Sequence, residues 1–191
     1  MMSKKNLRRN KTMKLRTKVI TGIVRLSYVY VWEPHSVNGG PEKYSVSIII
    51  PKDDLATLKK INDAVDAAIE EGLSKFGGKR PNKKAIKLPL RDGDTERDDP
   101  AYANSYFLNA STKTPPQIVD KNVEPIMNQG EIYSGVYARV SLNFYAFNSS
   151  GNKGVAVGLG NIQKIRDGEP LGGRTTAAED FGSAPVDDFL D

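Results

Sequence analysis

Cysteine is absent from the 191 residues, and histidine occurs only once. The lack of cysteine excludes disulfides, thiolate metal ligands and thiol nucleophiles, and it fits a reducing compartment. No apolar run approaches the roughly 18 residues that a membrane-spanning helix requires. The basic N-terminus also lacks the apolar stretch of a secretory signal. We therefore expect a protein that is not secreted and does not bind a membrane.

Catalytic motifs are missing as well. The sequence has no G-x-S-x-G elbow, no Walker A loop and no metalloprotease helix, and His35 lies in a glycine-rich loop. The one acidic cluster, RDGDTERDDP, fails the calcium-loop pattern, because Arg97 stands where glycine is needed and Ala103 where glutamate is needed. Acids interleaved with arginines favour a self-paired surface loop. We expect no enzyme activity, no cofactor and no metal.

Charge is concentrated at the two ends of the chain. The first eighteen residues hold eight Lys or Arg and no acid, whereas the last fifteen hold five acids and no base. The rest, with 20 basic and 18 acidic residues, is nearly neutral. We predict a basic flexible arm over 1–16, a folded domain over 17–172 and a flexible acidic tail over 173–191. The sequence leaves open whether Met1 or Met13 is the native start.

Hydrophobic periodicity predicts a mainly β domain. Strands are expected over 18–34, 43–51, 105–112, 131–148 and 154–168, with a bend at Gly22. One amphipathic helix is expected over 52–76, between the second and third strands, capped by Asp53 or Asp54. Five strands and one helix favour a small closed or partly open barrel.

Aromatic residues occupy the face of the fourth strand that should meet water. Alternation places Tyr133, Tyr137, Arg139 and Tyr145 on this face, opposite an apolar one. Proteins that hold single strands without reading sequence combine aromatic platforms with a basic groove, because every base has a π-face. Tyrosine also fits half-buried strands in general, and the helix must cover part of the sheet. Nucleic-acid binding is the favoured interpretation, and simple packing is the alternative.

Other strands and loops add candidates to this interface. The first strand offers Tyr28, Tyr30 and Trp32 near Arg25, and either Tyr106 or Phe107 should face outward. The residues predicted to stack on bases are Trp32, Phe107, Tyr133, Tyr137 and Tyr145. The residues predicted to contact phosphates are Arg25, Lys79, Arg80, Lys83, Lys84, Arg139 and Lys153.

Several stretches in order resemble a family of bacteriophage single-stranded-DNA-binding proteins. They are GIVRLSYVYVWEP, KYSVSIIIPKDD, LPLRDGDTERDDPAY, EIYSGVYARVSLNFYAFN and GNKGVAVGLGNIQKIRDGEPLGGRTTAAEDF, within residues 17–181. The resemblance implies a five-stranded oligonucleotide-binding (OB) fold and binding of single-stranded DNA with little sequence preference. It further implies a role in phage DNA replication, recombination or repair in the cytoplasm of the infected host.

The C-terminal VDDFLD resembles the acidic tips of single-stranded-DNA-binding proteins, which recruit replication or recombination proteins. Asp187, Asp188 and Phe189 would make this contact, although Leu190 and Asp191 follow the phenylalanine where such tips often end. The sequence leaves homo-oligomerisation, site size and the choice between DNA and RNA open. Two alternative functions remain: an assembly protein without single-strand preference, and a metal-dependent nuclease that uses the acidic loop 92–99.

Overall fold

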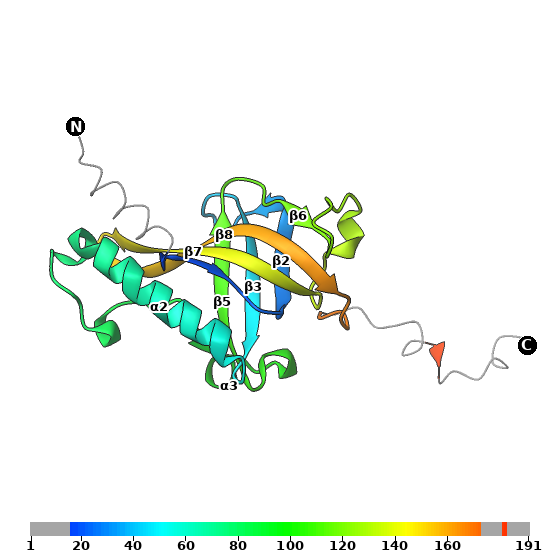
Figure 1. Cartoon of the computed structure of the whole chain (residues 1–191), viewed down its shortest axis with the longest axis horizontal. Coiled ribbons are helices and arrows are strands. Elements are labelled where there is room, and N and C mark those ends of the chain that lie inside the picture. The colour runs from blue at the N-terminus through cyan, green and yellow to red at the C-terminus, as the bar shows by residue number, and fades with distance from the viewer. Residues whose placement is uncertain (1–15, 173–180, 183–191) are drawn as a thin grey trace, which may run out of the picture.

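The computed structural model describes residues 16–172 and 181–182. Its strands are β1 (Lys18–Ile20), β2 (Val24–His35), β3 (Lys43–Pro51), β4 (Arg91–Asp92), β5 (Ser105–Thr112), β6 (Ile118–Val119), β7 (Tyr137–Ser149) and β8 (Asn152–Arg166). Its helices are α2 (Leu55–Glu71) and the single turn α3 (Gly93–Glu96), with 3₁₀ turns η1 (Leu73–Phe76), η2 (Lys83–Ala85), η3 (Pro100–Tyr102) and η4 (Gln129–Glu131). Figure 1 shows α2 running obliquely beside β7.

Five strands close into a ring in the order β2, β3, β5, β8 and β7, and β7 pairs again with β2. All neighbours are antiparallel except β5 and β8, which run parallel and meet at Ser111 and Gly158. β1 extends the sheet beyond β7, and β6 extends it beyond β8. The predicted five-stranded OB-like barrel is thereby confirmed.

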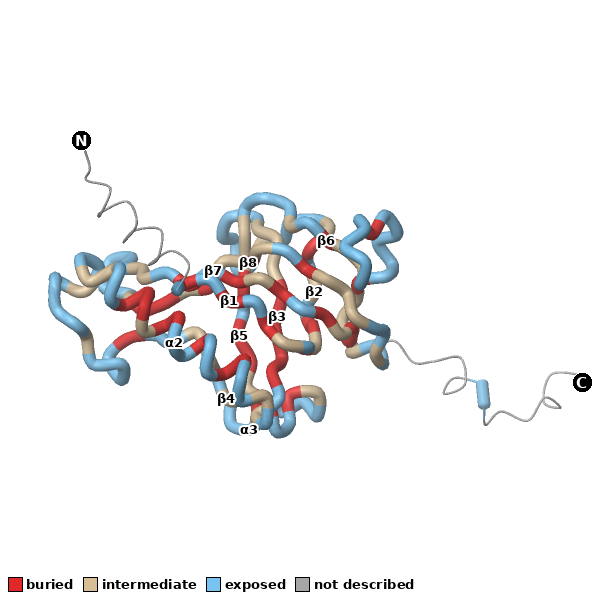
Figure 2. The backbone as a smooth tube through the Cα atoms, viewed as in Figure 1, coloured by how far each residue is buried: buried red, intermediate tan, exposed pale blue. Residues whose placement is uncertain are grey.

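Every second side chain along the first part of β7 points into the barrel and helps to fill it. Ala138, Val140, Leu142 and Phe144 are buried, and the residues between them face outward or lie half-buried. α2 packs Leu58, Ile61, Val65 and Ile69 onto the same core, so its apolar stripe closes one end of the barrel. Figure 2 shows the buried stripe of α2 turned toward the strands.

The helix forms where its sequence pattern predicts. The Asp54 side chain accepts a hydrogen bond from the N–H of Thr57 (3.1 Å), which caps the first turn. The α-helix ends at Glu71, and the last predicted turn is the 3₁₀ turn η1, followed by left-handed Gly77. One of the two predicted caps, Asp54, is thus the cap.

Two predicted strands differ from the observed ones by more than a two-residue shift of their ends. The first is divided into β1 and β2 at Gly22, whose N–H donates to Thr57 Oγ1 (2.9 Å). The fourth begins at Tyr137 instead of residue 131, because the chain turns at Gly135, which has a φ of 117°. A Cβ there would collide with the carbonyl oxygen of Glu169. Tyr133 therefore lies before the strand and not on its face.

Candidate nucleic-acid interface

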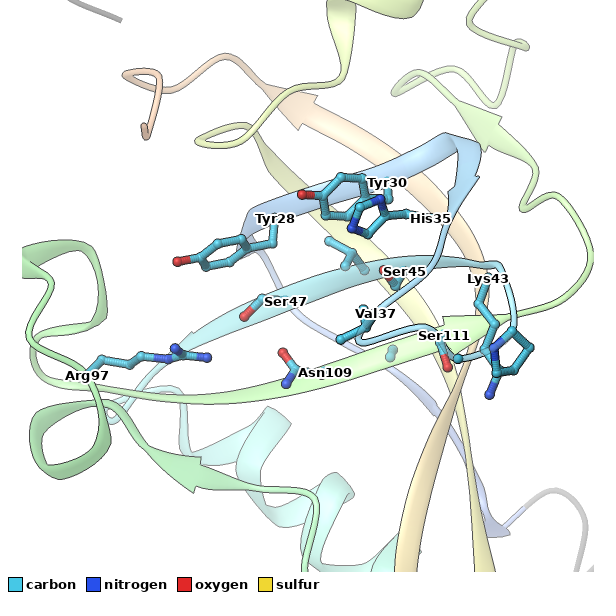
Figure 3. A pocket seen from close by; sticks show the side chains of 14 residues that line it. Tyr28, Tyr30, His35, Val37, Lys43, Ser45, Ser47, Arg97, Asn109 and Ser111 are labelled. Carbon is cyan, nitrogen blue, oxygen red and sulfur yellow. The ribbon is translucent and has the colours of Figure 1, made fainter. Parts of the chain in front are cut away.

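An open groove of about 590 Å³ crosses the outer face of β2, β3 and β5. The loop after β2 closes one end, and Arg97, which follows α3, lies at the other (Figure 3). The lining residues are Tyr28, Tyr30, His35, Val37, Gly40, Pro41, Lys43, Ser45, Val46, Ser47, Arg97, Asn109, Ala110 and Ser111. No acidic side chain is among these described residues, so the groove favours an anionic ligand.

A bulge in β2 gives the groove its aromatic wall. Ser27 pairs with Ser47 and Tyr30 pairs with Ser45, so two residues of β2 stand opposite Val46 alone. The extra residue shifts the alternation, and Tyr30 consequently shares a face with Ser27 instead of with buried Leu26. Both tyrosines line the groove, whereas the simple alternation of the sequence places them on the side of Leu26.

Tyr28 and Tyr30 present open aromatic surface. Tyr28 is 54% exposed and has a φ of 47°, an uncommon conformation for a bulky residue. Strain of this kind concentrates at functional sites. Tyr30 is 38% exposed and stacks on His35, with ring centroids 4.2 Å apart and planes within 8°. Figure 3 shows this stacked pair and the Tyr28 ring along one wall.

The floor of the groove is low and polar. Ser45 and Ser47 of β3 and Asn109 and Ser111 of β5 are cross-strand partners that point to the same side (Figure 3). Ser47 is fixed by a hydrogen bond of 3.0 Å between its hydroxyl and that of buried Tyr102. Small side chains leave room for a flat group between the tyrosine wall and the floor.

Arg97 is a cation without an acidic partner in the part of the chain that the structure describes. Its guanidinium carbon lies 4.9 Å from the ring centre of Phe107, 5.5 Å from that of Tyr102 and 6.0 Å from that of Tyr28. Its Nε–H is buried and has no hydrogen-bond partner among the described residues. The aromatic rings hold the guanidinium in place and leave its charge unneutralised.

The acidic loop that carries Arg97 is only partly self-paired, because Arg91 pairs with an acid of the loop, whereas the pairing that the sequence predicts for Arg97 is not found among the described residues. Lys52 Nζ contacts Asp92 (2.9 Å) and Asp94 (2.7 Å), while Arg91 contacts Glu96 (3.0 Å). Hydrogen bonds from Lys52 lower the pKa of both aspartates, and backbone N–H groups lower it further. The two carboxylates in turn raise the pKa of Lys52. Within the described residues, no group of three or more acidic or histidine side chains is arranged to hold a metal ion.

Replacing Asp94 by asparagine should make the stability of the fold less dependent on pH in the acid range. A carboxyl whose folded-state pKa is lowered stabilises the fold above its unfolded pKa near 3.8, and it loses this contribution as the pH falls through the folded value. We expect the wild type to lose stability below about pH 4 more steeply than Asp94→Asn. Melting temperatures between pH 2 and pH 7 measure this, with the exposed Asp98→Asn as the matched control. Parallel profiles for Asp94→Asn and the wild type would contradict it.

Two of the predicted stacking residues, Phe107 and Trp32, do not line the groove. Phe107 does point away from the barrel core, but Tyr102 covers it edge-on (5.1 Å between ring centres) and the Arg91 and Arg97 guanidiniums flank it, so it is 0% exposed. Trp32 packs against the core, and its Nε1 is buried. The prediction of base stacking therefore does not fit Phe107, and Trp32 does not line the groove.

The predicted stacking residues near the start of β7, Tyr133 and Tyr137, contact other side chains and backbone groups of the protein. The Tyr133 hydroxyl lies 3.0 Å from Asp167 Oδ1 and 2.9 Å from the carbonyl oxygen of Gly168. Lys164 and this hydroxyl lower the pKa of Asp167. Tyr137 lies beneath two guanidiniums, of Arg25 (5.4 Å) and Arg166 (4.2 Å). Tyr133 and Tyr137 are thus engaged within the protein and lie outside the groove.

All seven of the predicted phosphate-binding residues also lie outside the groove lining. Arg25 donates to the carbonyl oxygens of Gly135 (3.1 Å) and Glu169 (2.6 Å). Arg139 is exposed on β7 and donates from Nε to Thr21 O (3.2 Å). Arg80 and Lys83 pair with acids of α2. Lys79 and Lys84 are exposed and Lys153 is half-buried, and none of the three lines the groove.

Sequence reasoning thus missed the residues that make the groove. From the first strand it selected Trp32, whereas the structure exposes Tyr28 and Tyr30, and it treated Arg97 only as part of a surface loop. No local pattern marks the bulge, since its signal is an unequal number of residues between two cross-strand pairs. Asp187, Asp188 and Phe189 lie outside the described residues. None of the described helices is long and apolar enough to cross a membrane.

A closed five-stranded barrel with an open groove across its strands is the architecture of OB-fold proteins that bind oligonucleotides and oligosaccharides. The sequence pattern of the family described as Enterobacter phage Enc34, ssDNA-binding protein matches residues 17–190. The chain belongs to this phage family, which confirms the resemblance in the sequence.

Individual relatives agree with this assignment. The chain is 34% identical over 168 residues to protein p50 of Acyrthosiphon pisum secondary endosymbiont phage 1, which covers 83% of this chain and 89% of that protein. The single-stranded-DNA-binding protein of bacteriophage Enc34, solved in complex with ssDNA, superposes with a TM-score of 0.72 at 23% identity, covering 82% of this chain and 90% of the other. The bacteriophage T7 single-stranded-DNA-binding protein gp2.5 superposes with a TM-score of 0.60 at 12% identity, and the match covers 91% of this chain and 98% of the T7 protein. These structural matches support the fold.

Proposed function

We propose that this protein binds single-stranded DNA in the groove of β2, β3 and β5, with little preference for sequence. The observation that carries the proposal is the pairing of two exposed tyrosines with an unneutralised arginine over a floor without acids. The Enc34 protein, a member of the same family, was solved in complex with ssDNA. That relative supports the same ligand for this chain.

The groove would hold the strand by stacking and by charge. Bases stack on Tyr28 and on the Tyr30–His35 pair, and each stacked base contributes roughly 1 to 3 kcal/mol whatever its identity. Arg97 and Lys43 contact phosphates from the two ends of the groove. Asn109 is exposed and Ser45 and Ser111 are half-buried, and these three floor residues donate hydrogen bonds to base edges or accept them whatever the base. No bond is made or broken, so the product is a protected single strand.

The biological role that fits this activity is the protection of phage single strands during DNA replication, recombination or repair. The site of action would be the cytoplasm of the infected bacterium. Replication or recombination proteins are the proposed partners of the acidic tail, through Asp187, Asp188 and Phe189. Co-purification of host and phage proteins with the full chain and with a chain ending at residue 181 tests this recruitment.

Binding to a poly-pyrimidine oligonucleotide is expected to weaken with salt. Each phosphate contact contributes a slope of about −0.7 in a plot of log K against log salt. Parallel titrations of single-stranded DNA, duplex DNA and single-stranded RNA over the same salt series show which polymer the groove accepts. Equal affinity for duplex and single-stranded DNA at moderate salt would favour the assembly-protein alternative. Cleavage of labelled strands with Mg²⁺ or Mn²⁺ would instead support the nuclease.

Replacing Arg97 by methionine should reduce the salt slope by about 0.7, the contribution of one phosphate contact on a single strand. Methionine keeps apolar contact with Phe107 while removing the charge. The matched control is Arg91→Met, because Arg91 also stacks on Phe107 (5.0 Å) but is paired with Glu96 and does not line the groove. A slope unchanged in Arg97→Met would exclude Arg97 as a phosphate contact.

A further inference from the structure

The outer face of the groove continues around the barrel in one row of cross-strand partners. Tyr30 pairs with Ser45, Ser45 with Ser111, and Ser111 with Gly158. Gly158 in turn pairs with Asn143 of β7, and Asn143 with Lys18 of β1. Directly paired residues point to the same face of a sheet. The row therefore leads from the groove across the β5–β8 junction to β7 and β1 without leaving the outer surface.

The β5–β8 junction is formed by Ser111 and Gly158, so it presents only one small side chain at the surface. At Gly158, a Cβ would come no closer than 3.5 Å to Asn143 O and 3.9 Å to Tyr145 Cε1, which are ordinary contacts. Internal packing therefore does not require glycine there. The nearby Gly154 and Gly160 differ, because a Cβ would collide with Lys87 O in one case and with Ser141 Oγ in the other. The bare backbone at Gly158 leaves the surface beside the Tyr145 ring open.

An exposed aromatic ring and two cations lie beyond this junction. Tyr145 is 45% exposed and lines a second cleft of about 480 Å³ together with Lys18 and Lys75. Both lysines are exposed, and neither forms an ion pair with a described residue. Glu71 is the one acid in the described lining of this cleft. The chemistry repeats that of the groove: an aromatic platform next to unneutralised positive charge.

We propose that a single strand longer than the groove crosses the β5–β8 junction at Ser111 and Gly158 and continues onto this second surface. One further base stacks on Tyr145, and Lys18 and Lys75 contact the phosphates that flank it. This inference rests on the proposed function and adds a second binding site to it. Short oligonucleotides then occupy the groove alone, and longer ones occupy both surfaces.

Oligonucleotides of graded length, from about 4 to about 16 nucleotides, separate the two surfaces. Tyr145→Ala should bind the shortest oligonucleotides as the wild type does, and should lose about 5- to 140-fold in affinity for the longest, the contribution of one stacked base. Tyr145→Phe keeps the ring and should match the wild type at every length. Lys18→Gln with Lys75→Gln should reduce the salt slope for long oligonucleotides only, by about 1.4 for two contacts.

Gly158→Glu offers an independent test, because the Cβ is accommodated and the carboxylate stands in the proposed path. Affinity for long oligonucleotides should fall, while affinity for short ones stays unchanged. A loss in Tyr145→Ala that is equal at all lengths, or absent at all lengths, would overturn the second surface. Such results leave the proposed function standing as long as short oligonucleotides bind and that binding depends on Tyr28 and Tyr30. If the wild type binds none of the oligonucleotides, the proposed function fails as well.

Discussion

Replacing Tyr28 and Tyr30 together by alanine is expected to weaken single-stranded DNA binding by at least about 30-fold. Each ring provides a stacking platform worth roughly 1 to 3 kcal/mol, and a loss of 1.4 kcal/mol is tenfold in affinity. Both side chains are substantially exposed, so their removal takes little apolar contact from the core. The fold should therefore still melt cooperatively while the interface loses its aromatic wall.

Fluorescence anisotropy with a short poly-pyrimidine strand measures this loss. Tyr44→Ala is the matched control, because Tyr44 lies on neighbouring β3 but does not line the groove. The single variants divide the effect between the two rings, and removal of Tyr30 also leaves His35 without its stacking partner. Wild-type affinity in the double variant would place the binding site elsewhere, with the outer face of β7 as the next surface to test.

Phe107→Ala is expected to destabilise the protein by about 3 to 5 kcal/mol, the usual cost of removing a buried phenylalanine. Its ring is fully buried against Ile49 and Tyr102, and it supports the guanidinium of Arg97. The cavity left behind would remove the edge-on contact with Tyr102 and would also release Arg97 from its position at the groove. A secondary loss of DNA affinity should therefore accompany the loss of stability.

Urea denaturation gives the free energy of unfolding for this comparison. The control is Asn109→Ala, an exposed position on the same strand, where a change within about 0.5 kcal/mol is expected. If Phe107→Ala kept wild-type stability and lost only DNA affinity, the side chain would act at the interface, as the sequence suggested. That outcome would contradict the burial of its ring.

Periodicity was sufficient for the fold because it reports which residues must leave water. The alternation in β7 and the three- and four-residue spacing in α2 each match the buried face that forms. The residues at which strands begin and end are less predictable from the sequence. Gly135 ends the extended chain before β7, since its φ of 117° and its contact with Glu169 are tertiary features that no neighbouring residue reveals. The alternation therefore predicts Tyr133 on the face of a strand, whereas β7 begins four residues later, at Tyr137.

The binding surface was likewise predictable from the sequence only in part. The sequence by itself determined that the chain carries aromatic and basic residues on strands, a helix that closes the core and an acidic loop whose carboxylates form ion pairs. Only the tertiary structure decided which of those side chains stay free. The bulge opposite Val46 moves Tyr28 and Tyr30 to the outer face, and the fold around Phe107 turns a candidate platform into the support for Arg97. The physical reason is that exposure depends on pairing register and on what other segments cover, and both are set by residues far away in the chain.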